Sequence, residues 1–73
     1  MKRYLKQYFN NYLGEIFIEN SSRNVYYIHF DNQTTFNSQI VFNPNFKNCM
    51  HNLGFSINYG DKIVTISKKT IKN

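Results

Sequence analysis

The side chains best suited to catalysis in this sequence are His29 and Asp31, two positions apart at the end of an aromatic and β-branched run. Side chains at i and i+2 of a strand point to the same side, so the carboxylate could orient an imidazole that takes up a proton. A small ribonuclease would use such a histidine as its general base. That reaction also needs a phosphate cradle or a positioned nucleophile, and no glycine-rich loop supplies one. We therefore predict a protein that is not an enzyme, with a small ribonuclease toxin as the minor alternative.

Cys49 and His51 form the second pair with ligand chemistry. The chain has one cysteine and two histidines, whereas a structural zinc site uses four ligands. We predict no metal and no cofactor, with Cys49 as a small, buried apolar side chain.

The basic residues lie mostly toward the two ends of the sequence. Nine Lys and Arg against four Asp and Glu give a net charge of +5, and neither residues 1–13 nor residues 62–73 include an acid. If the two ends meet, they form one cationic face that attracts phosphate groups or an acidic protein. The alternative is a solvated helix face and a frayed tail. The predicted contacts are Arg3, Lys6, Asn10, Lys62, Lys68 and Lys69.

Seven Phe and six Tyr must supply most of the core. A sheet covered on one face by the first helix would leave four residues on its other face: Phe17, Val25, Tyr27 and His29. Either the C-terminal hairpin or the short helix covers them, or they form an exposed patch. Such aromatics suit a protein interface, and beside basic residues they can also stack on nucleic-acid bases. Since no RNP-type motif is present, we favour a protein interface for Phe17 and Tyr27.

The elements that position these residues can be read from apolar spacing. Residues 2–13 place Leu5, Phe9 and other apolar residues on one stripe of a helix that Gly14 would end. Residues 15–19, 25–30 and 35–42 are predicted strands, the last with Phe36 and Ile40 on one face.

The remaining elements are a short helix and a hairpin. Asn45 would cap the helix and Gly54 would end it. The hairpin joins residues 55–59 to 62–67 through a Gly60-Asp61 turn that pairs Tyr59 with Lys62. Residues 68–73 are expected to be a flexible basic tail.

We thus predict a single small α+β domain, residues 1–73, with an N-terminal helix, a three-stranded antiparallel sheet, a short helix and a C-terminal β-hairpin. The order of its first five elements resembles that of double-stranded-RNA-binding domains and of some small toxins. The basic start of the second helix in those domains is missing, because Phe46-Lys47-Asn48 offers one lysine. No family is assigned. The small core and many apolar faces also allow a homodimer.

The composition favours residues with A/T-rich codons, with three Gly and one Pro in the whole chain, which indicates an A/T-rich genome such as that of a phage or an organelle. The sequence has no signal-peptide pattern and no apolar run long enough for a membrane helix, so we expect the cytoplasm, of the host for a viral protein, or an organelle matrix.

The first functional hypothesis is a non-enzymatic protein that docks onto nucleic acid or a nucleoprotein complex, for example a ribosome-associated or accessory factor. The alternative is an inhibitor encoded by a phage or mobile element, acting on a host nucleoprotein enzyme as anti-CRISPR proteins do, with an aromatic interface.

Overall fold

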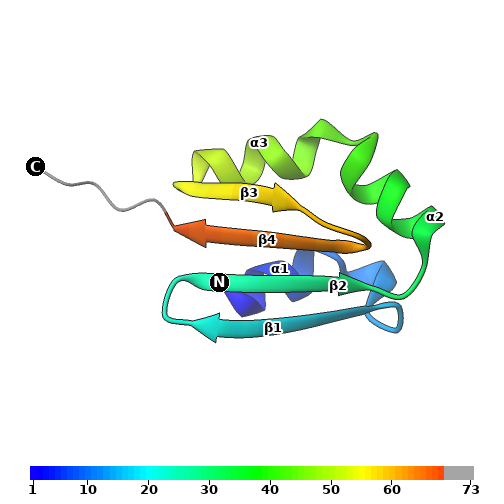
Figure 1. The fold of residues 1–73 in the computed structure, drawn as a ribbon, viewed down its shortest axis with the longest axis horizontal. Helices are drawn as coiled ribbons and strands as arrows, with labels where there is room; N and C mark the ends of the chain where they lie inside the picture. Colours follow the sequence, from blue (N-terminus) through cyan, green and yellow to red (C-terminus); the bar gives the residue numbers. More distant parts are fainter. Residues whose placement is uncertain (69–73) are drawn as a thin grey trace, which may run out of the picture.

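A four-stranded antiparallel sheet is the frame of the molecule (Figure 1). The computed structural model describes residues 1–68. The strands lie in the order β1-β2-β4-β3. Their bounds are Ile16–Ser22 for β1, Val25–Phe30 for β2, Phe55–Tyr59 for β3 and Ile63–Lys68 for β4. The predicted α+β class is confirmed, but the sheet has four strands instead of three. The predicted third strand is helical, and both strands of the C-terminal hairpin join the sheet through the pairing of β4 with β2.

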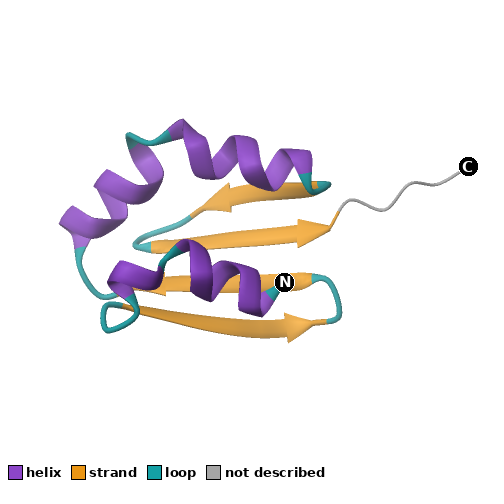
Figure 2. Cartoon of the chain, turned by 180° about the vertical axis from the view of Figure 1, so that it is seen from behind, coloured by secondary structure: helices purple, strands orange, loops and turns teal. Residues whose placement is uncertain are grey.

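The helices lie on one face of this sheet (Figure 2). Helix α1 packs against β1 and helix α3 packs against β3, while α2 and a π-helical turn, η2, connect β2 to α3. The helical bounds are Lys2–Tyr8 for α1, Asn10–Tyr12 for the 3₁₀ turn η1, Gln33–Phe36 for α2, Asn37–Val41 for η2 and Pro44–Asn52 for α3. Among the described residues, none of these helices has the length and apolarity needed to cross a bilayer.

The core fills the space between the helices and one face of the sheet. Phe9, which directly follows α1, is completely buried, and its ring centroid lies 5.7 Å from that of Phe30 and 5.2 Å from that of Phe46. Alternate residues of β2, Ile28 and Phe30, are buried on this side. Strand side chains point to opposite faces in turn, so the residues between them must face away from the core.

The predicted third strand over residues 35–42 is wrong, because this segment is helical. Phe36 and Ile40 are buried as expected, but a spacing of four puts two side chains on one face of a helix as well as of a strand. Asn32 starts the helix: its Oδ1 accepts hydrogen bonds of 2.7 and 3.2 Å from two backbone N–H groups in the first turn, as N-caps do.

Helix α1 ends earlier than the predicted 2–13. Phe9 leaves the helical conformation with φ −100° and ψ 29°. Asn10 and Asn11 have low helix propensity, and only one 3₁₀ turn follows. Leu5 and Phe9 nevertheless enter the core as the periodicity predicted.

The C-terminal hairpin is confirmed, with its register shifted by two residues. Tyr59 pairs with Val64 instead of Lys62. The Gly60 N–H donates to the Ile63 carbonyl at 2.8 Å, and Lys62 adopts a φ of 57° in the turn. Because side chains alternate with a period of two, a shift of two keeps every residue on its predicted face.

Three boundaries also differ from the sequence expectation. Strand β1 continues to Ser22, whereas the expected strand covered residues 15–19. Helix α3 begins at Pro44, since the Asn43 Oδ1 accepts the Asn45 backbone N–H at 3.0 Å. Strand β4 includes Lys68, and the rest of the expected tail lies outside the described residues.

Candidate interaction surface

The face of the sheet opposite the helices has no other element over it in the described part of the chain. We call this face the open face. None of its residues is buried, and Phe17 is 63% exposed. Of the three arrangements considered from the sequence, the structure therefore shows the exposed patch, since the hairpin lies beside β2 within the same sheet. The open face comprises Phe17, Glu19, Val25, Tyr27, His29, Ser56, Asn58, Ile63, Thr65 and Ser67.

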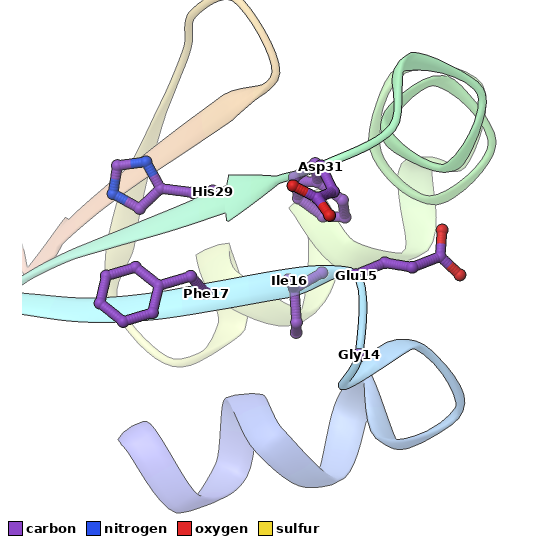
Figure 3. Close-up of a pocket in the computed structure, with 7 residues that line it drawn as sticks. Gly14, Glu15, Ile16, Phe17, His29 and Asp31 are labelled. Atoms are coloured by element: carbon purple, nitrogen blue, oxygen red, sulfur yellow. The ribbon is translucent and has the colours of Figure 1, made fainter.

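Three rings form a continuous strip across β1 and β2. Phe17 lies directly opposite His29 in the strand pairing, and their ring centroids are 5.6 Å apart (Figure 3). The ring of Tyr27 lies 6.4 Å from that of His29 on the same strand. We call Phe17, His29 and Tyr27 the aromatic strip. It presents apolar ring surface without any side chain of a helix above it.

His29 is paired with Glu19 and not with Asp31. Its Nε2 lies 3.1 Å from the Glu19 Oε1, so an Nε2–H donates to that carboxylate. Asp31 lies past the end of β2 (Figure 3). Together with residues that include His29 and Phe17, it lines a hollow of about 260 Å³. Glu15, at the same hollow, accepts a 2.7 Å hydrogen bond from Thr35 Oγ1. The imidazole and these carboxylates thus share a hollow, but the one carboxylate that holds the imidazole is Glu19.

Two lysines of α1 lie at the outer edge of β1. Lys2 and Lys6 line a second hollow together with apolar residues that include Leu13, Ile16 and Phe17. Phe17 therefore belongs to the open face and to this edge. We call Lys2 and Lys6 the basic edge. Within residues 1–68, no Lys or Arg lies within 4.0 Å of an Asp or Glu carboxylate, so these ammonium groups are available to an external anion.

The other predicted contact residues are divided between the two ends of the sheet. Lys68 ends β4, with its Nζ 5.5 Å from the Phe55 ring centroid, and it shares a hollow with Met1 and Tyr4, so the described ends of the chain do meet. Lys62 lies at the opposite end of β4, about 20 Å away at the usual rise per residue.

The remaining two contacts on α1 and η1 are exposed. Arg3 and Asn10 are both open to solvent, as is Lys6. Lys69 lies outside the described residues. The structure therefore brings Lys6 next to Phe17, but it does not gather all the predicted cations on one face.

Comparison with protein-family models, curated proteins and solved structures found no match for this chain. Its function is therefore inferred from the open face and the basic edge alone.

Lys2 is the residue of this surface that sequence reasoning missed. It lies four positions before Lys6, and residues at i and i+4 of a helix are neighbours on one side. That spacing was the available signal. The link between these lysines and Phe17 depends on how α1 packs on β1, which no local pattern reveals.

A separate polar contact connects the two main helices. Asn45 Nδ2 donates to the Tyr8 hydroxyl at 3.0 Å. Burial raises the pKa of Tyr8, and the hydrogen bond from Asn45 partly opposes this. The pKa of Tyr4 is also raised, by burial first and then by the neighbouring Cys49. These groups lie on the helical side and are not part of the open face.

The remaining ligand-type residues stay dispersed. Cys49 is half-buried and His51 is exposed, both on α3. Within residues 1–68, no three Asp, Glu, His or Cys side chains come together in a group able to hold a metal ion.

Proposed function

We propose that this protein is a non-enzymatic binding protein that docks onto nucleic acid or a nucleoprotein complex through the open face and the basic edge. One observation carries the proposal: Phe17, whose ring is exposed, lines the same hollow as Lys2 and Lys6. An aromatic ring offers a contact for a base, and the ammonium groups beside it offer contacts for the phosphates.

The distribution of charge supports the same function. The net charge of +5 attracts a polyanion over a distance, and this attraction raises the association rate at low salt. The Lys and Arg side chains of residues 1–68 have no carboxylate within 4.0 Å. They can therefore bind phosphate without first breaking an ion pair inside the protein.

The test is a titration of labelled oligonucleotides with the purified protein at about 50 and 200 mM salt, the range over which phosphate contacts lose affinity steeply. We expect the logarithm of the association constant to fall by about 0.7–0.9 per neutralised phosphate for each unit of the logarithm of the salt concentration. The double variant Lys2→Glu/Lys6→Glu should bind more weakly and with a smaller slope. The double variant Arg23→Glu/Lys47→Glu reverses two exposed cations outside the basic edge and is the control matched in charge. No binding to any oligonucleotide at low salt would refute the proposal.

The second candidate is a protein–protein inhibitor of a host nucleoprotein enzyme. It is favoured by the exposure of Phe17 and the position of Tyr27 on the same uncovered face, because interfaces are enriched in such aromatics. For such an inhibitor, Phe17→Ala and Tyr27→Ala would weaken binding to the partner protein more than charge reversal at the basic edge does. The affinity would change little with salt.

A further inference from the structure

We infer that the ligand of the open face is a single-stranded nucleic acid whose bases stack on the aromatic strip. This inference rests on the proposed function and names the form of nucleic acid that the surface fits. It specifies unpaired bases stacked on the aromatic strip, whereas the proposed function requires only that this surface binds nucleic acid of some form.

The first step is the arrangement of the rings. Phe17 and His29 are direct cross-strand partners with centroids 5.6 Å apart, and Tyr27 follows 6.4 Å from His29. Unpaired bases can be splayed onto such rings, and this contact tolerates any sequence because every base has a flat aromatic face. In a duplex, each base is covered above and below by its neighbours, so its face is closed to the strip.

The second step is the shape of the surface. The major groove of a DNA duplex admits a helix or a two-stranded ribbon. The open face is the side of a four-stranded sheet, and in residues 1–68 the helices lie on its other side (Figure 2). A four-stranded sheet face is wider than the elements that the major groove admits, and it can support a single strand laid across it.

The third step is the polar surroundings of the strip. Beyond Tyr27, the same row of the sheet continues with Thr65 on β4 and Asn58 on β3, whose hydroxyl and amide groups can hydrogen-bond to the edges of bases. Beyond Phe17, the basic edge provides ammonium groups for the phosphates. Glu19 is the carboxylate of this face, and its contact with His29 holds it beside the imidazole.

The experiment uses a tryptophan placed in the strip. The natural sequence contains no Trp, so Phe17→Trp gives an emission signal from that one position. Phe42→Trp is the matched control, because Phe42 is 76% exposed but lies between η2 and α3, away from the open face. We expect single strands of about ten nucleotides, as RNA and as DNA, to quench Phe17→Trp and leave Phe42→Trp unchanged.

Affinity gives the second measurement. Phe17→Ala should weaken single-strand binding by roughly 5- to 150-fold, the loss that corresponds to one stacked base. Phe17→Tyr should keep the affinity of the natural protein. Neither variant should lower the melting temperature, since this side chain is outside the core. Binding of the duplex should not respond to either variant.

The outcomes separate this inference from the proposed function. Equal, salt-dependent binding of single strands and duplexes with unchanged Phe17→Trp emission would overturn the stacking inference and leave the proposed function in place. Absence of binding to every oligonucleotide would overturn both and direct the search to a protein partner.

Discussion

The imidazole of His29 and the carboxylate of Glu19 meet diagonally across β1 and β2, with Nε2 and Oε1 3.1 Å apart. Diagonal neighbours in an antiparallel pair are within reach of long and aromatic side chains. This contact holds the imidazole between Phe17 and Tyr27. The contact therefore fixes the position of one ring of the aromatic strip, and it places a carboxylate beside the strip.

A first prediction concerns this carboxylate. Glu19→Gln keeps a hydrogen-bond acceptor near His29 and removes a negative charge from the open face. Unit charges 4 Å apart interact by about 1 kcal/mol in water, so affinity for a single-stranded oligonucleotide should rise by up to about fivefold at 50 mM salt. Anisotropy titration measures this, with Asp61→Asn in the β3–β4 turn as the control. A weaker complex with Glu19→Gln would mean that the carboxylate contacts the ligand directly.

A second prediction contrasts two phenylalanines. Phe9 is fully buried between Phe30 and Phe46, and Phe→Ala in a core costs about 3–5 kcal/mol. A chain of this length has a free energy of unfolding of about 4–11 kcal/mol, so Phe9→Ala should remove at least about a quarter of it. Phe17→Ala should stay within about 0.5 kcal/mol of the natural protein.

Urea denaturation followed by circular dichroism tests this contrast. Phe9→Leu provides a milder change if the alanine variant does not fold. Equal losses of stability at positions 9 and 17 would show that Phe17 is covered in solution, for instance by a second copy of the chain.

A third prediction concerns the capping of α2. Asn32→Ala removes the acceptor of two hydrogen bonds at 2.7 and 3.2 Å and should lower the free energy of unfolding by about 1 kcal/mol. Asn48→Ala alters an exposed residue within α3 and should be neutral or slightly stabilising, because alanine is the better helix former. Chemical denaturation of the pair measures the difference. If Asn32→Ala costs nothing, packing of Phe36 and Ile40 alone keeps this segment helical.

A fourth prediction concerns alkaline pH. Burial raises the pKa of Tyr8 above its ordinary value of 10.0, so the folded state holds that proton more tightly than the unfolded state. The resulting stabilisation is complete below pH 10 and is lost as the pH rises through the folded-state pKa. Tyr8→Phe should therefore show a smaller fall in the free energy of unfolding above pH 10.

Urea titrations at neutral and alkaline pH measure this effect. Tyr59→Phe, at an exposed position of β3, is the control and should keep the pH dependence of the natural protein. At neutral pH, Tyr8→Phe also loses the hydrogen bond from Asn45, which corresponds to about 1 kcal/mol. An alkaline fall that is the same in both variants would show that Tyr8 does not cause it.

Elements with one dominant pattern were predictable from the sequence. Residues 25–30 are mostly β-branched or aromatic, and β2 has these bounds. Phe46 and Met50 are four positions apart, and both are buried on the core side of α3. The faces of the hairpin were also correct despite the shifted register, since the shift is an even number of residues.

Other parts depend on contacts that a local pattern does not contain. Phe36 and Ile40 satisfy the period of a strand and of a helix equally, and the Asn32 cap selects the helix. The exposure of Phe17 depends on β4 pairing with β2, which places the hairpin beside the first two strands instead of over them. The proximity of Lys2 to Phe17 likewise follows from the packing of α1 on β1.

The strand order has a consequence for how the chain folds. The outer pairs, β1–β2 and β3–β4, are hairpins that can close locally, but the central β2–β4 pair joins segments far apart in the sequence, with α2 and α3 between them. Closing that long loop costs chain entropy before the central contacts form. We therefore expect the two hairpins to form as early, unstable units and their docking to limit the folding rate. Hydrogen exchange should be slowest at the amides that join β2 to β4.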